Sequence, residues 1–121
     1  MINGGLATIY VSDMDRAVKF YTEALGMKLL YQAGPGWAQI DAGKGLTLGL
    51  HGTHGGGPAP GQNGATIIGF ELDEPMDQAY ETLSQRGVQF QGPIQETEHV
   101  RLANFSDPDG NAFYLSETKQ P

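Results

Sequence analysis

The sequence predicts an α+β fold in which two tandem βαβββ modules form cupped, mixed β-sheets with their helices on the outer face. Three observations support this prediction. Stretches of alternating apolar residues indicate strands, and two apolar stripes at helical spacing indicate one helix in each half of the chain. The second half also repeats the pattern of the first at offsets of 61 to 65 residues. At 121 residues, the chain is expected to form a single domain, 1–121.

The first module is expected over about residues 4–51. It opens with a strand at 6–11, whose side chains alternate between the two faces of a sheet. A helix follows, from a cap at Ser12 or Asp13 to Gly26 in the left-handed conformation. Three further strands, separated by glycine-rich turns, are predicted at 28–32, 37–41 and 46–50.

Residues 52–64 form a predicted linker, because their glycines and prolines disfavour helix and strand alike. The pattern then restarts, and the second module is expected over about 65–118. Pro75 begins its helix and Gly87 ends it. The last two strands flank the turn Asp107-Pro108-Asp109-Gly110, whose aspartates are expected to serve the turn through backbone hydrogen bonds. The remainder is predicted to contain an irregular stretch at 94–100 and strands at 66–72, 88–91, 103–106 and 112–116.

Each four-stranded sheet has one helix, which can cover one face, so the other face is left open for a ligand or a partner. The side expected to pack against the helices is uniformly apolar: Ala7, Ile9, Val11, Leu46, Leu48, Leu50, Ile68, Phe70, Leu72, Phe113 and Leu115. The opposite side has the mixed composition of a small-molecule pocket or of a solvated sheet face: Leu6, Thr8, Tyr10, Thr47, Gly49, His51, Ile67, Gly69, Glu71, Ala112, Tyr114 and Ser116.

The composition argues against several classes of function. The formal net charge is −7 and lysine and arginine form no cluster, so we expect neither nucleic acid nor an anionic membrane as a partner. The chain has no cysteine, which excludes disulfides, a thiolate nucleophile and a zinc–thiolate site. The N-terminal stretch lacks a basic region and a long apolar run, so no signal peptide or membrane span is expected and the cytoplasm is the expected location.

Two motifs add a family resemblance to this pattern. The stretches VSDMDRAVKFYTEALGMK at 11–28 and DPDGNAFYLSE at 107–117, together with the paired modules, resemble the vicinal oxygen chelate superfamily. This superfamily contains glyoxalase I, bleomycin resistance proteins and extradiol dioxygenases, and the resemblance covers nearly the whole chain. It implies that the two sheets curve into a cupped pocket. It also implies a homodimer in which module 1 of one subunit faces module 2 of the other.

Enzymes of this superfamily hold a divalent metal, which acts as a Lewis acid, with His and Glu side chains on the concave face. The resemblance places the four ligand positions at Leu6, Gly49, Ile67 and Tyr114. The repeat independently pairs Leu6 with Ile67 and Gly49 with Tyr114. A divalent metal of this kind prefers imidazole or carboxylate ligands, and none of the four residues provides them. We therefore expect no metal cofactor and no catalytic residue.

An alternative metal site with displaced ligands would use His51 and Glu71, which are on the concave face. The protein would then be a divalent-metal-dependent lyase, isomerase or dioxygenase of the glyoxalase type. His51 could also bind a metal together with His54 if the linker folded back, or both histidines could be solvated. Glu71 could instead be a carboxylate at the rim of the sheet, paired with Arg101 or Lys28.

The leading hypothesis is a metal-free protein that binds a small organic molecule, aromatic or cationic, in the concave pocket at a dimer interface. The aromatic residues would stack on the ligand, Glu71 would hold a positive group, and the negative net charge would attract a cation. Trp37 could instead pack in the core or at the dimer interface. A third hypothesis is a structural or regulatory dimer that uses the concave face only as an interface. The expected ligand-binding residues are Leu6, Tyr10, Trp37, Gly49, His51, Ile67, Glu71 and Tyr114.

Overall fold

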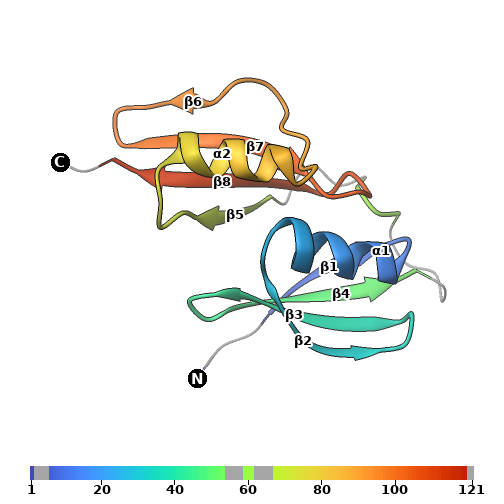
Figure 1. Ribbon diagram of the computed structural model, residues 1–121. Coiled ribbons are helices and arrows are strands. Elements are labelled where there is room, and N and C mark those ends of the chain that lie inside the picture. Colours follow the sequence, from blue (N-terminus) through green and yellow to red (C-terminus); the bar gives the residue numbers. More distant parts are fainter. Residues whose placement is uncertain (2–5, 54–58, 62–66, 120–121) are drawn as a thin grey trace.

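The computed structural model describes residues 1, 6–53, 59–61 and 67–119, and it confirms the α+β fold of two tandem modules (Figure 1). No helix within these stretches is long and apolar enough to cross a membrane. Module 1 consists of β1 (Ala7–Val11), α1 (Met14–Lys19), the π-helical turn η1 (Phe20–Ala24), β2 (Lys28–Ala33), β3 (Trp37–Gly43) and β4 (Leu46–Gly52). Module 2 consists of β5 (Ile68–Glu71), α2 (Met76–Gln85), β6 (Gln95–Glu96), β7 (Val100–Ser106) and β8 (Ala112–Thr118).

The two sheets have the same topology and the same register, as the repeat in the sequence predicts. Their strand orders are β1-β4-β3-β2 and β5-β8-β7-β6. In each module the first strand is parallel to the last, and the other neighbours are antiparallel. Ala7 pairs with Leu48 in module 1, and their repeat equivalents Ile68 and Phe113 pair in module 2. The offsets found in the sequence therefore align the two modules strand by strand.

Module 2 differs from the prediction at its outer edge. The strand predicted at 88–91 is wrong, because in this stretch there is only an isolated bridge between Phe90 and Phe105. The edge strand is β6, which is within the segment predicted to be irregular and pairs with β7. Gly92 has a φ of +78°, so the chain turns there. Only after this turn does the chain pair with β7, as β6.

The core is between the sheets and the helices and is shared by the two modules. Every residue predicted to face the helices belongs to it, either buried or packed half-buried against the buried cluster. The helix-facing side of the first strand is buried more completely in module 1 than in module 2. Ile9 and Val11 are 6% and 0% exposed, whereas their repeat equivalents Phe70 and Leu72 are only half-buried. The first strand of module 2 therefore keeps part of its apolar face accessible.

Asp107 is a buried carboxylate in the turn between β7 and β8, with 4% of its surface exposed. It accepts hydrogen bonds from the backbone N–H groups of Asp109 and Asn111, at 3.0 and 2.8 Å, and from the Asn111 amide at 2.8 Å. The hydroxyl of Tyr21, in η1 of module 1, donates a further bond at 2.9 Å. Burial, and then the negative charge of Asp107, raise the pKa of Tyr21 well above its ordinary value. The turn function expected of this aspartate is confirmed, and the carboxylate also links the two modules.

Asp109 holds the same turn against the start of α1. Its carboxylate accepts hydrogen bonds from the backbone N–H of Ser12, at 3.1 Å, and from the Ser12 hydroxyl, and it lies 3.6 Å from the guanidinium of Arg16. The Asn111 amide donates to the carbonyl oxygen of Tyr10 at 3.0 Å. We call these contacts between the turn at 107–111 and residues 10–21 the closed junction.

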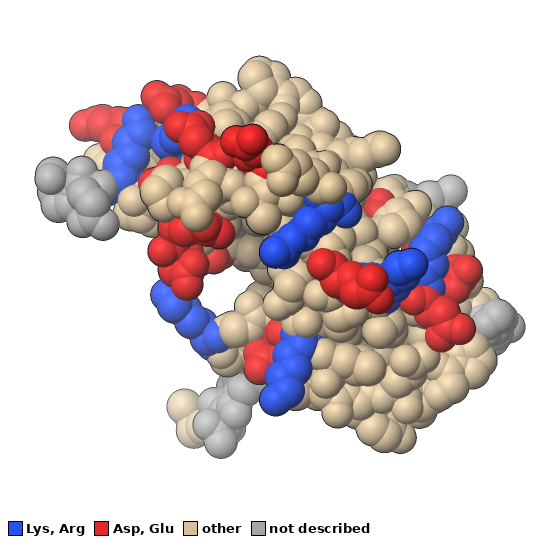
Figure 2. Space-filling view, viewed as in Figure 1, with Lys and Arg blue, Asp and Glu red and all other residues tan. Residues whose placement is uncertain are grey.

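The repeat equivalent of the closed junction is at the other end of the modules, where the turn between β3 and β4 meets the end of β5. Lys44 occupies the position equivalent to Asp109, and its ammonium group lies 3.7 Å from the carboxylate of Glu71. The two side chains are 83% and 76% exposed, so this ion pair is expected to contribute less than about 1 kcal/mol. Figure 2 shows an opening between the modules that is bordered by acidic and basic side chains. We call the contact between residues 43–46 and 69–73 the open junction.

Candidate ligand-binding site

Three of the predicted site residues stand side by side on the helix-free face of the module 1 sheet. Tyr10 pairs with His51 between β1 and β4, and His51 pairs with Trp37 between β4 and β3. The ring centroids of Tyr10 and His51 are 4.9 Å apart, and those of Trp37 and His51 are 6.1 Å apart. Cross-strand neighbours on one face interact in this way because their side chains project in the same direction. We call this group the aromatic row.

Gly49 allows the indole of Trp37 to lie across the module 1 sheet. A Cβ atom at Gly49 would overlap ring carbons of Trp37 and would lie 3.0 Å from Cδ1 of Leu6. Gly49 is consequently buried, although it is on the helix-free face. Leu6 lies beside it and is 40% exposed. The structure therefore places Leu6 and Gly49 next to Trp37 of the aromatic row.

The module 2 sheet has a similar arrangement, with Tyr114 lying on Gly69. The two residues pair directly between β5 and β8, and a Cβ atom at Gly69 would overlap the ring and hydroxyl of Tyr114. Ile67 immediately precedes β5 and is 52% exposed. Gly69 is absent from the expected site residues. A glycine inside a strand often marks the close approach of another group, and this signal could have identified it.

The two residues of the alternative metal site are not brought together. His51 is in the aromatic row near the end of β4, with Nδ1 2.6 Å from the carbonyl oxygen of the next residue. If Nδ1 carries the proton and donates it there, Nε2 is left as an acceptor. Glu71 belongs to the open junction, and its partner Lys44 precedes the start of β4. In the described part of the chain, Glu71 therefore pairs with neither Arg101 nor Lys28.

The residues at the four ligand positions do not fit a divalent metal site. Leu6, Gly49, Ile67 and Tyr114 together offer one phenol oxygen, and Tyr114 lies flat over its neighbouring strand. Across the described residues, no group of three or more His, Cys, Asp or Glu side chains could hold a metal ion. The remaining histidine candidate, His54, lies outside the described residues.

Comparisons with known proteins relate this architecture to one family. A family model described as Glyoxalase/Bleomycin resistance protein/Dioxygenase superfamily matches residues 5–115. TnmS3, an antibiotic binding protein from Streptomyces sp. CB03234, is 32% identical with a TM-score of 0.79, over 98% of each chain. A superfamily member from Sphaerobacter thermophilus DSM 20745 is 30% identical with a TM-score of 0.80, over 97% of this chain and 98% of that chain. The uncharacterized protein YetH of Bacillus subtilis (strain 168) is 29% identical over 117 residues, which are 93% of this chain and 96% of YetH.

Proposed function

The chain belongs to the Glyoxalase/Bleomycin resistance protein/Dioxygenase superfamily, and on this premise we propose that it binds a small organic molecule, without a metal, on the helix-free faces of its sheets. The observation that carries this proposal is the pair of aromatic-on-glycine surfaces, Trp37 on Gly49 and Tyr114 on Gly69. The antibiotic binding stated for TnmS3, a relative with the same architecture, supports a small-molecule ligand.

The chemistry of these faces favours a planar ligand with a positive group. Trp37 and Tyr114 provide aromatic surfaces on which a flat ligand can stack. The exposed side chains of Leu6 and Ile67 offer apolar area that a ligand would remove from water. Aromatic ring faces attract cations, and the net charge of −7 attracts them from a distance. His51 adds a hydrogen-bonding group in the middle of the aromatic row.

We further propose that a second copy of the chain completes the site. Leu29, Leu30 and Tyr31 follow one another on β2, the outer edge strand of the module 1 sheet, and are 38%, 50% and 55% exposed. An exposed apolar edge strand favours pairing with another chain. Light scattering at micromolar concentration should give a dimer for the wild type and a monomer for Leu30→Lys, with Ser84→Lys on α2 as the control. A monomeric wild type would contradict this.

Trp37 is the one tryptophan of the chain, so its fluorescence reports directly on ligand binding. We would titrate the full chain with bleomycin, with the planar cation 9-aminoacridine and with the planar anion anthracene-2-carboxylate. We expect a saturable change with at least one compound and tighter binding of the planar cation than of the anion. Gly49→Leu should abolish the response because its side chain would occupy the space of the indole. Gly36→Leu is the matched control, since a Cβ there meets nothing within 4 Å. Equal responses of the two variants would contradict the proposed site.

Metal analysis separates this function from that of a glyoxalase-type enzyme. For protein purified without a chelator, we expect substoichiometric nickel, zinc, manganese and iron, and unchanged ligand binding after dialysis against EDTA. A stoichiometric metal that is lost in His51→Ala would overturn the metal-free proposal and support a metal-dependent lyase, isomerase or dioxygenase.

A further inference from the structure

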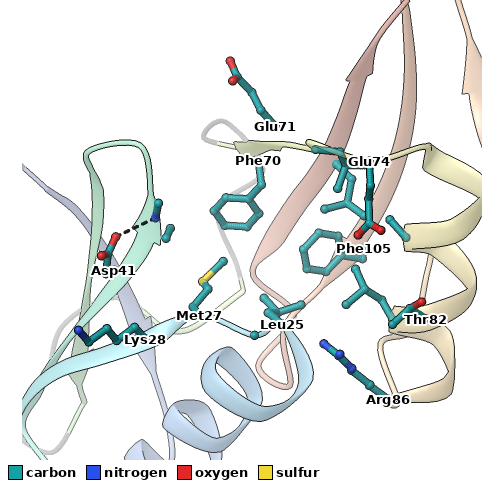
Figure 3. A pocket seen from close by; sticks show the side chains of 17 residues that line it. Leu25, Met27, Lys28, Asp41, Phe70, Glu71, Glu74, Thr82, Arg86 and Phe105 are labelled. Atoms are coloured by element: carbon teal, nitrogen blue, oxygen red, sulfur yellow. Dashed lines mark hydrogen bonds between the residues drawn. The ribbon is translucent and has the colours of Figure 1, made fainter.

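A cleft on the helix side of the molecule lies where the open junction leaves the modules apart (Figure 3). Its volume is about 380 Å³, within the range of small-molecule pockets, about 300–1,000 Å³. Module 1 contributes the residues that follow η1 and the end of β3, and module 2 contributes β5, α2, β7 and β8. The cleft is on the opposite side of the sheets from the aromatic row. It is therefore a cavity distinct from the proposed ligand-binding faces.

The wall of this cleft is mainly apolar and aromatic. In Figure 3, Met27 of module 1 and Phe70 of module 2 point toward each other across it. Phe70 is half-buried here, whereas its repeat equivalent Ile9 is 6% exposed. An apolar ligand would remove the exposed part of Phe70 on β5 from water. On β1, packing within the protein already buries the equivalent residue. The main apolar residues are Leu25, Met27, Phe70, Leu83, Phe105 and Leu115.

Two charged groups at the rim are already engaged by the protein. Asp41 accepts a hydrogen bond from the backbone N–H of Gly43 at 2.8 Å, and Arg86 donates to the carbonyl oxygen of Ala24 at 3.4 Å. Each of these groups already has a hydrogen-bond partner within the protein. The hydrogen bond of Arg86 joins the end of α2 to the end of η1. Neither group is therefore the first choice to receive a charged ligand.

The remaining charged groups differ in direction. Glu71 points away from the cleft in Figure 3 and pairs with Lys44, and Lys28 also extends away from it. The carboxylate of Glu74 projects toward Phe105, beside the apolar wall. A carboxylate beside an apolar wall suits an amine with an apolar body, because the carboxylate attracts the ammonium group while the body packs on the wall. The cleft thus combines an apolar wall with one inward-facing negative charge.

We propose that this cleft is a second ligand site, which takes a small amine with an apolar, ring-sized body. The body packs between Met27 and Phe70, and the ammonium group lies at Glu74. The site does not depend on the aromatic row, so it can be present whether or not the helix-free faces bind a ligand.

Two naphthalene probes of the same shape test this site in the full chain. We would record two-dimensional amide NMR spectra with 2-naphthylmethylamine, which is cationic at neutral pH, and with 2-naphthylmethanol, which is neutral. We expect both probes to shift the amide signals of Met27, Ala42 and Thr82, whether or not they also shift those of Gly49 and Tyr114 on the helix-free faces. The amine should bind more tightly than the alcohol.

Two glutamate-to-glutamine variants test whether Glu74 holds the ammonium group of the amine. Glu74→Gln should weaken amine binding about three- to fivefold, the size expected of an exposed ion pair, and should leave alcohol binding unchanged. Glu81→Gln makes the same charge change on α2 but lies outside the cleft, so it should change neither. Thr82→Phe should fill the cleft and abolish binding of both probes. The two glutamine variants keep the test decisive if Thr82→Phe does not fold.

Several results would overturn the proposal. The proposal would be wrong if neither probe shifted the cleft amides, or if the shifts were confined to the helix-free faces. It would also be wrong if the two glutamine variants had equal effects on amine binding, or if a folded Thr82→Phe retained full binding. Shifts of the cleft amides with protein concentration alone would show that a second copy occupies the cleft instead. Gly49→Leu should leave cleft binding unchanged, so a failure of this site and a failure of the proposed function are distinguishable.

Discussion

The two junctions between the modules occupy equivalent places in the repeat, but they contribute very differently to the structure. In the closed junction, the carboxylates of Asp107 and Asp109 receive hydrogen bonds from Tyr21 and Ser12 of the other module. In the open junction, the exposed side chains of Lys44 and Glu71 form an ion pair. The closed junction seals one end of the shared core, whereas the open junction leaves a cleft beside β5. One short turn can therefore hold two modules together while the equivalent turn leaves space for a ligand.

Removal of the buried carboxylate should break the closed junction and have the largest effect. Asp107→Ala leaves the Tyr21 hydroxyl and the amide and backbone N–H of Asn111 without their acceptor. We expect the free energy of unfolding to fall by about 3–5 kcal/mol, as measured by urea denaturation, because one buried donor and several part-buried donors lose their partner together. Asp107→Asn keeps one acceptor oxygen and should cost less. A loss below about 1 kcal/mol for the alanine variant would contradict this role.

Tyr21 links the closed junction to pH. Its pKa in the folded protein is raised above the ordinary value of 10.0, first by burial and then by the charge of Asp107. The unfolded chain therefore loses this proton at lower pH than the folded protein does. This group should leave stability constant below about pH 10 and lower it as the pH rises above that value.

Tyr21→Phe tests this linkage by urea denaturation between pH 7 and pH 11. At pH 7 the variant should lose about 1.5–3 kcal/mol, the contribution of a hydrogen bond to a charged group. Above pH 10 its stability should decline less than that of the wild type, because the titrating hydroxyl is gone. Parallel declines in the two proteins would show that Tyr21 does not carry the pH dependence.

Asp109→Ala and Lys44→Ala compare the two junctions at equivalent positions of the repeat. Asp109 has a 7% exposed side chain and accepts hydrogen bonds from Ser12, so its removal should cost about 1–2 kcal/mol. Lys44 has an exposed side chain and an exposed partner, and its removal should cost less than about 0.5 kcal/mol. Equal losses of unfolding free energy would remove the distinction between a closed and an open junction.

The sequence predicted the features that depend on strand periodicity and on turn chemistry. Alternation placed Ile9, Val11 and Phe113 in the core, because successive side chains of a strand face opposite sides of the sheet. The same rule placed Tyr10 and His51 on the helix-free face, where strand register makes them neighbours. These features are local or repeat at a fixed offset, so the pattern of residues contains them.

Other features depend on contacts that no local pattern specifies. The indole of Trp37 covers Gly49 because of its side-chain orientation across two strands, which periodicity does not determine. Glu71 pairs with Lys44 because the modules bring their turns together. The cleft arises from how closely the two sheets approach each other, and this depends on the long-range packing of η1 and α2. Residue alternation therefore predicts which side chains share a face of a sheet, but not the shape of the space between the two modules.

The most direct test of ligand binding without a metal is a crystal structure of the protein grown with the tightest-binding compound from the titration. We expect electron density for the organic molecule between Leu6, Gly49, Ile67 and Tyr114, with the Trp37 and Tyr114 rings against it and no metal ion at these positions. A metal ion coordinated by His51, or density for the compound only away from both helix-free faces, would contradict the proposed function.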